Sequence, residues 1–226
     1  MCEGKILLGI YMKRFLILLV SCVLTSFAQA QVSMRDVWLS MPDSILPYLN
    51  RSLRTEHVDF MDRQMKSEVK NLLHESGVLD TLTNDFASYY LPQSSSLEMR
   101  LLTTADSSQV ICLVKTVMAP EAESEVRFFD SSWQPLADDY GLPLHLSEGV
   151  ILKQFTHQPS DMTDERFDEL CKMIDPVMLS ASLSASSPMI TLCLSTPVLT
   201  KQELDDVAVI AKQISFKWDG VRFKEY

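Results

Sequence analysis

The stretch Val110-Ile111-Cys112-Leu113-Val114 is an unbroken run of apolar residues near the middle of the chain. A strand with one face in water alternates apolar and polar side chains, whereas a strand covered on both faces is apolar throughout. The run therefore predicts a strand that lies inside a sheet and is covered on both sides.

Further strands are predicted on either side of this stretch. Leu97, Met99 and Leu101 alternate with Glu98 and Arg100, a pattern that is typical of a half-buried strand. The other predicted strands are 125–130, 149–155, 177–183, 189–194 and 214–218, the last of which returns to Phe223 through a hairpin at Asp219-Gly220.

Apolar spacing and capping residues predict five helices. They are 34–41 capped by Ser33, 43–53 capped by Asp43, 59–75 ended by Gly77, 163–174 opened by Thr163, and one that begins at the capping box Thr200-Lys201-Gln202-Glu203. Together these elements predict an α+β fold with a mostly antiparallel sheet packed by amphipathic helices.

The N-terminus has the pattern of a secretory signal peptide. Met12-Lys13-Arg14 precedes an apolar run from Phe15 to Phe27, and Ala28-Gln29-Ala30 is a small-residue cleavage site. The run is shorter than the ~20 residues of a membrane-spanning helix. We expect Met12 to be the natural start, residues 1–30 to be removed between Ala30 and Gln31, and the protein to be periplasmic or secreted.

Lipidation is the alternative fate of this N-terminus. Leu19-Val20-Ser21-Cys22 fits the lipobox of a bacterial lipoprotein, which would anchor the chain through Cys22. The apolar run is very short before Cys22 and continues beyond it, which favours the unlipidated form. In either case residues 31–226 are expected to form a single domain, and two lobes would divide at the polar break near 158–162.

Charge and glycine content exclude several classes of function. The 226-residue chain has a formal net charge of −10, which argues against nucleic-acid binding because phosphate contacts need clustered Lys and Arg. Only four glycines lie beyond residue 30, and each is isolated. Dinucleotide and phosphate loops need clustered glycines, so no cofactor is expected.

The residues that usually carry catalysis or bind metals form no recognised motif. Cys112, Cys171 and Cys193 are too far apart for a C-x-x-C pair and are interpreted as buried apolar residues, although a Cys171–Cys193 bridge is conceivable. The only metal-like spacing is that of His57 with nearby acidic residues. Solvated histidines at helix ends explain the histidines better, so no metal is expected.

Several stretches resemble one family of proteins. They are 34–42, 58–62, 110–120, 127–129 with Trp133, and Phe216-Lys217-Trp218-Asp219-Gly220-Val221-Arg222-Phe223. Together they resemble a domain-of-unknown-function family of secreted proteins found in Bacteroides-type Gram-negative bacteria. The resemblance covers nearly the whole expected mature chain and implies a location in the cell envelope. It implies no catalytic or binding residue.

Methionine is abundant, with 12 residues in the chain, and it suits adaptable apolar binding surfaces as well as cores. We therefore expect a non-enzymatic envelope protein that holds a hydrophobic small molecule or a protein partner between sheet and helices. Its expected ligand-binding residues are Trp38, Met61, Met65 and Trp218. The alternatives are an envelope hydrolase that uses His145, His157 and nearby carboxylates, and a purely structural adaptor.

Overall fold

The computed structural model describes residues 31–92, 94–118, 121–196 and 199–226. The chain divides into two compact units, Met1–Gln31 and Val32–Tyr226. The first unit lies almost entirely outside the described residues. So do the expected signal peptide at 1–30 with its start at Met12, its cleavage site at Ala30, and the alternative lipidation site at Cys22. All helices and strands named below belong to the second unit.

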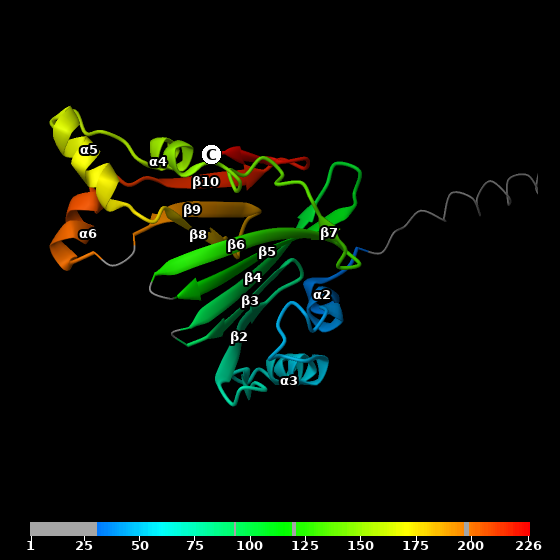
Figure 1. The fold of residues 1–226 in the computed structure, drawn as a ribbon. Helices are drawn as coiled ribbons and strands as arrows, with labels where there is room; N and C mark the ends of the chain where they lie inside the picture. Colours follow the sequence, from blue (N-terminus) through cyan, green and yellow to red (C-terminus); the bar gives the residue numbers. More distant parts are fainter. Residues whose placement is uncertain (1–30, 93, 119–120, 197–198) are drawn as a thin grey trace, which may run out of the picture. The chain divides into compact units, whose positions relative to one another are not determined.

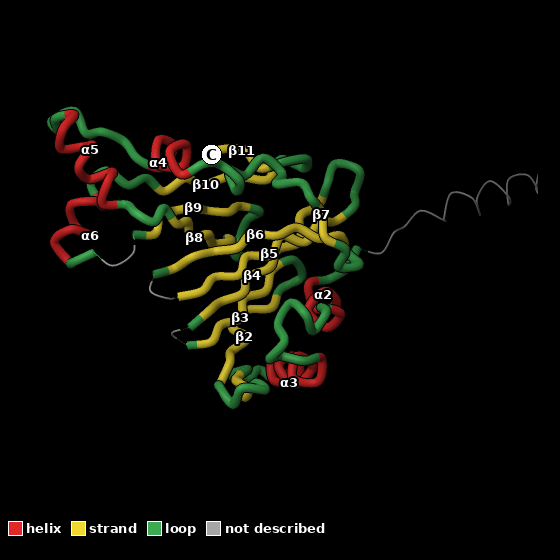
Figure 2. Tube along the Cα trace, viewed as in Figure 1, coloured by secondary structure: helices red, strands yellow, loops and turns green. Residues whose placement is uncertain are grey.

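Five helices and eleven strands make up the described part of this unit (Figures 1 and 2). The helices are α2 (Met34–Ser40), α3 (Arg51–Asp62), α4 (Glu148–Phe155), α5 (Asp164–Met173) and α6 (Lys201–Ala208). The strands are β1 (Glu68–Lys70), β2 (Ser76–Leu82), β3 (Phe86–Leu91), β4 (Ser95–Thr103), β5 (Gln109–Met118), β6 (Ala122–Asp130), β7 (Pro135–Leu136), β8 (Met178–Leu183), β9 (Met189–Ser195), β10 (Gln213–Trp218) and β11 (Phe223–Glu225). The predicted α+β class is confirmed.

The first sheet is a seven-stranded antiparallel meander in which β1 to β7 follow chain order. The predicted strand at 110–114 lies within β5, which pairs along its length with β4 and β6, for example Leu113 with Met99 and with Arg127. All five residues of the apolar run are buried. The prediction of an interior strand is confirmed.

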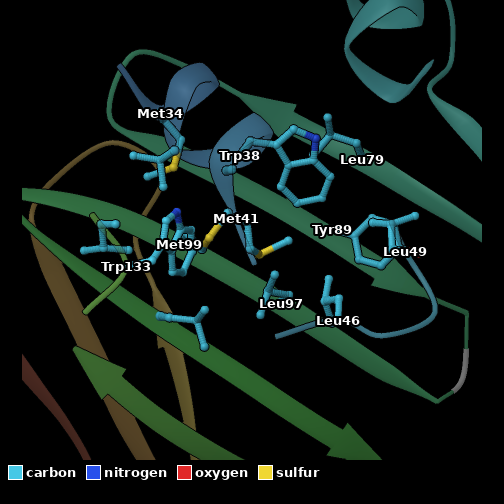
Figure 3. Close-up of a cluster of buried hydrophobic side chains, with 14 of the residues drawn as sticks. Met34, Trp38, Met41, Leu46, Leu49, Leu79, Tyr89, Leu97, Met99 and Trp133 are labelled. Carbon is cyan, nitrogen blue, oxygen red and sulfur yellow. The ribbon is translucent and has the colours of Figure 1, made fainter. Parts of the chain in front are cut away.

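Helices α2 and α3 cover one face of this sheet. Their apolar side chains pack with residues from β2 to β5 in one buried cluster, which includes Ile111 and Leu113. Figure 3 shows Trp38 of α2 among methionine and leucine side chains of this cluster. The indole Nε1 donates a hydrogen bond to the carbonyl of Arg54 at 3.1 Å, which joins the two helices. The first core is therefore a helix-on-sheet core.

The second sheet covers the opposite face. It has four antiparallel strands in the order β11-β10-β9-β8, and β8 contacts β4, β5 and β6. Val110, Cys112 and Val114 of β5 pack in a second buried cluster with residues of this sheet. Because successive side chains of a strand point to opposite faces, β5 supplies both cores in alternation. This explains why its sequence is apolar throughout.

The half-buried pattern predicted for β4 is wrong. Glu98 and Arg100 face the second sheet instead of water, and Arg100 is buried. The carboxylate of Glu98 accepts a hydrogen bond from the backbone of Leu183 at 2.7 Å. The guanidinium of Arg100 donates to the carbonyl of Ser184 and to Asp85. Polar side chains on β4 therefore join the two sheets.

The helix predicted over 59–75 is also wrong, because α3 ends at Asp62. The chain then forms β1, in which Val69 pairs with Gly77 of β2. The side-chain carbonyl of Asn71 accepts hydrogen bonds from the backbone of Leu73 and Glu75. Local bonds of this kind favour a turn over a helix, and the helical spacing of the apolar residues had no structural meaning.

Two further segments differ from the prediction. Residues 43–49 form turns, and the helix begins at Arg51 with Asn50 as its N-cap. The guanidinium of Arg54 fixes this turn segment by donating to the carbonyls of Met41 and Leu49. Residues 149–155, predicted as a strand, lie in α4, because a short apolar run suits a buried helix as well as a strand.

Three of the four predicted N-caps are confirmed, and the one at Asp43 is wrong because Asn50 caps α3. Ser33 forms a capping box with Asp36 at the start of α2, Thr200 forms one with Glu203 at the start of α6, and Thr163 caps α5. Leu170 of α5 and Val207 of α6 pack in a third, smaller buried cluster. Strands β10 and β11 form the predicted hairpin.

In the described ranges, no helix combines the length and apolarity needed to cross a membrane.

Candidate functional site

A cleft of about 370 Å³ lies where the two sheets meet. Strands β6, β8 and β9, helix α4 and the segment before it contribute to its wall. Eight of its twelve lining residues are apolar: Val126, Leu144, Ile151, Val177, Met178, Leu179, Ala181 and Leu192. Its volume is at the lower end of the ~300–1,000 Å³ that is typical of small-molecule sites. The cleft can therefore take an apolar group of modest size.

The strands around the cleft are tied together by Ser124. Its hydroxyl oxygen accepts a hydrogen bond from the backbone N–H of Ala181 at 2.8 Å, and it bonds Thr116 of β5 at 2.8 Å. Since Ser124 is on β6 and Ala181 on β8, these contacts fix the spacing of the two sheets at the cleft. The wall is therefore built before any ligand arrives, which lowers the entropy lost on binding.

The four polar lining residues of the cleft are Glu123, Ser124, Glu125 and His145. Glu125 lies 3.8 Å from Arg127, and Lys115 is its cross-strand partner. Glu123 makes no ion pair with any residue in the described ranges. The polar part of the wall is therefore acidic on balance.

His145 is the one histidine of the predicted hydrolase set that lies at this cleft. Its side chain is 82% exposed, and Nε2 is 3.3 Å from Oδ1 of Asp139. His157 does not line the cleft. Its ring and its backbone N–H both face the carbonyl of Ile210. The structure thus places one of the two histidines beside a carboxylate and the cleft.

A second hollow, of about 480 Å³, lies between α4 and α5 and opens more widely to solvent. Cys171 lines it. Burial raises the pKa of the Cys171 thiol above its ordinary value, so the thiol is protonated at neutral pH and is a weak nucleophile. Cys112, Cys171 and Cys193 are all free, and burial also raises the pKa of the Cys112 and Cys193 thiols.

The four residues predicted to bind a ligand do not come together. Trp38 is fully buried in the first core, and Trp218 is buried in the second, where its Nε1 donates to the carbonyl of Thr103. Met61 packs against the first core, and Met65 is 52% exposed beyond the end of α3. None of the four lines the cleft, and their role in binding stays a prediction.

His57 is not the solvated residue that was expected. It is fully buried in α3, its Nδ1 lies 2.7 Å from the hydroxyl of Ser67, and that hydroxyl donates to the carbonyl of His57. The hydroxyl of Ser67 therefore accepts a hydrogen bond from the Nδ1–H group of His57, and burial lowers the pKa of His57 to about 4.

Within the described ranges, no group of three or more His, Cys, Asp or Glu residues is placed to hold a metal ion.

Sequence reasoning missed the cleft because its lining residues are distant in the chain. Glu123 and Leu192 are brought together only when the two sheets pack. The one local signal was the alternation of Val177, Leu179, Ala181 and Leu183, all of which lie on the cleft side of the second sheet. That alternation predicted a buried face without indicating what faces it.

Comparisons with known proteins agree with the fold. A family model described as "Protein of unknown function (DUF3256)" matches residues 25–223. The structure of a domain of an uncharacterized protein from Porphyromonas gingivalis W83 is similar, with a TM-score of 0.68 and 22% sequence identity over 87% of this chain and 99% of that chain. At this identity the likeness supports the fold alone. No match was found among proteins with curated descriptions. The chain belongs to the DUF3256 family of proteins of unknown function.

Proposed function

We propose that this protein is a non-enzymatic binding protein of the bacterial cell envelope, which holds an apolar group in the cleft between β6, β8 and α4. The observation that carries the proposal is the cleft itself. It combines an apolar wall with a few convergent polar groups, which is the usual composition of a ligand site. The signal-peptide pattern of residues 1–30 supports the envelope location.

Native mass spectrometry of the protein purified gently from its own cell envelope tests this proposal. We expect the mass of Gln31–Tyr226 plus a smaller noncovalent mass that is lost on denaturation. Covalent acyl mass on a chain that starts at Cys22 would establish the lipoprotein instead. A bare chain in every preparation would contradict ligand binding and favour the structural adaptor.

Two variants of β8 locate the ligand. Ala181 lines the cleft, whereas Ser182 is exposed on the other face of the same strand. We expect Ala181→Phe to fill the cleft and abolish the noncovalent mass, and Ser182→Phe to leave it in place. Loss of the ligand from both variants, or from neither, would place the ligand elsewhere.

An envelope hydrolase is the second candidate, because His145 lies at the cleft 3.3 Å from Asp139. A general base of this kind would need a nucleophile or a water within hydrogen-bond reach. Hydrolysis of p-nitrophenyl acetate by the purified protein, compared with His145→Ala, separates the two candidates. Turnover that depends on His145 would contradict the proposed binding function and support the hydrolase.

A further inference from the structure

The outer edge of β6 has no strand paired with it along most of its length. Strand β7 pairs only with Phe128 and Phe129, so residues 122–127 pair with β5 on one side and with no strand of the described chain on the other. Strand β8 contacts β6 without forming a ladder with it. The N–H of Asp130 donates to Gln134 on the β7 side at 3.0 Å. Because strand groups alternate with a period of two, the N–H groups of Val126 and Ser124 point to the same outer edge.

Strand β8 is also an edge strand, because it ends the second sheet. Two of its outward N–H groups, those of Ala181 and Leu183, donate to side chains of the first sheet. The same alternation turns the N–H of Leu179 outward, and Leu179 lines the cleft. Free backbone groups of two edge strands therefore border one apolar cleft.

An exposed strand edge binds an extended peptide through backbone hydrogen bonds, while pockets beside it select side chains. We propose that the cleft takes an extended, basic peptide segment that adds as a strand to the outer edge of β6. An apolar side chain of the segment enters the cleft, and a neighbouring basic side chain pairs with Glu123. This inference rests on the proposed binding function and names its ligand class.

Charge selects a basic segment over a second copy of this chain. The outer edge of β6 carries Glu123 and Glu125, and Glu121 precedes it, while Lys115 and Arg127 both lie beside Glu125. Neither Glu121 nor Glu123 forms an ion pair within the described chain, and Lys115 is the basic residue that shares a hollow with Glu123 and Glu125. Charged side chains on an edge oppose pairing between identical edges, and like charges directly opposite one another destabilise a strand pair. The same negative charges attract a basic segment and therefore favour its binding.

Two peptides and one uncharged dye test the proposal. The first peptide alternates lysine with valine over eight residues, and the second carries glutamate in place of lysine. The dye is Nile red, which reports on the apolar cleft. We expect the lysine peptide to displace the dye and to protect the amides of Ser124 and Val126 from hydrogen exchange in the ¹⁵N-labelled protein. We expect the glutamate peptide to do neither.

Matched variants separate backbone pairing from side-chain packing and charge. Val126→Pro removes the outward N–H without removing a bond to β5, whereas Val126→Ala keeps the N–H and loses at least as much apolar side-chain volume. We expect Val126→Pro to weaken the lysine peptide about tenfold relative to Val126→Ala. Glu123→Lys should weaken it as well, while Glu56→Lys on the exposed face of α3 should not.

The outcomes distinguish this inference from the function on which it rests. Displacement and amide protection that are lost in Val126→Pro support strand addition. Dye binding in the cleft without competition or amide protection by the lysine peptide would overturn strand addition and leave the binding function standing. Equal binding of both peptides would overturn the charge selection. If neither dye nor peptide binds, the proposed function fails too.

Discussion

The backbone N–H of Ala181 donates a hydrogen bond to the side-chain hydroxyl of Ser124 at 2.8 Å, although the two residues belong to different sheets. An edge strand normally leaves such groups to water or to a further strand. Here side chains of the first sheet take that place, since Glu98 accepts from Leu183 in the same way. The two sheets are therefore joined by hydrogen bonds as well as by apolar packing.

Ser124→Ala should destabilise the protein because it leaves the N–H of Ala181 and the hydroxyl of Thr116 without this partner. We expect the free energy of unfolding to fall by about 1–3 kcal/mol, because Thr116 is buried and the N–H of Ala181 is half-buried. Urea denaturation measures the change. The matched variant Ser132→Ala, at an exposed position, should stay within about 0.5 kcal/mol of the wild type. Equal effects of the two variants would contradict the role of Ser124.

The parts of the fold that sequence predicted correctly depend on short-range chemistry. The predicted N-cap at Ser33 and the predicted capping box at Thr200 involve residues three positions apart, and the burial of Val110 to Val114 follows from a continuous run. These features are visible without knowledge of the tertiary structure, because propensity and pattern act locally.

The errors arose where distant residues decide the local structure. Leu72 and Leu73 have helical spacing from Met65, yet all three are largely exposed, because β1 pairs with β2 and ends the helix. Glu98 and Arg100 looked solvent-facing until β8 covered them. The cleft combines β6, β8, β9 and α4, so no local pattern could have indicated it.

Arg54→Met tests the segment that sequence predicted as a helix. The buried guanidinium donates to the carbonyls of Met41 and Leu49, and Asp43 is its ion-pair partner. We expect a loss of about 1–3 kcal/mol for each buried carbonyl left unpaired. Asp43→Asn should cost less than about 1 kcal/mol, because Asp43 is 58% exposed. Urea denaturation of both variants measures the difference, and a larger effect at Asp43 would contradict this account.

His57 should make the protein less stable in mild acid. Burial lowers its pKa to about 4 in the folded protein, whereas the unfolded chain has the ordinary value of about 6.5. Between these values the unfolded state binds a proton that the folded state does not, so the free energy of unfolding falls as the pH falls. The loss is complete near pH 4 and amounts to about 3 kcal/mol.

Urea denaturation at several pH values between 7.5 and 4.5 measures this effect. His57→Gln should be less stable than the wild type at pH 7.5, because it disturbs the contact with Ser67, but its stability should depend less on pH over this range. His145→Gln, at an exposed histidine, should keep the wild-type slope. The same slope in wild type and His57→Gln would show that another group is responsible.

Gly77 is a glycine whose lack of a side chain is required by close packing against Tyr89. A Cβ atom at this position would lie 1.9 Å from the hydroxyl oxygen of Tyr89 and 2.5 Å from the ring carbon that bears it. Gly77→Ala should therefore destabilise the protein by about 1–3 kcal/mol or more through overpacking. Gly149 in α4 is the matched control, since its added Cβ would meet nothing within 4 Å, and Gly149→Ala should stabilise by up to about 1 kcal/mol.

A double-mutant cycle with Tyr89→Phe tests the cause of this effect. The buried hydroxyl of Tyr89 has no hydrogen-bond partner in the described chain, so its removal alone should cost little. In the Tyr89→Phe background Gly77→Ala should be less harmful, because the 1.9 Å contact is gone. The rescue should be partial, because the ring carbon still lies within 2.5 Å of the new Cβ. Additive effects of the two substitutions, measured by urea denaturation, would show that the clash with the hydroxyl is not the reason for glycine at this position.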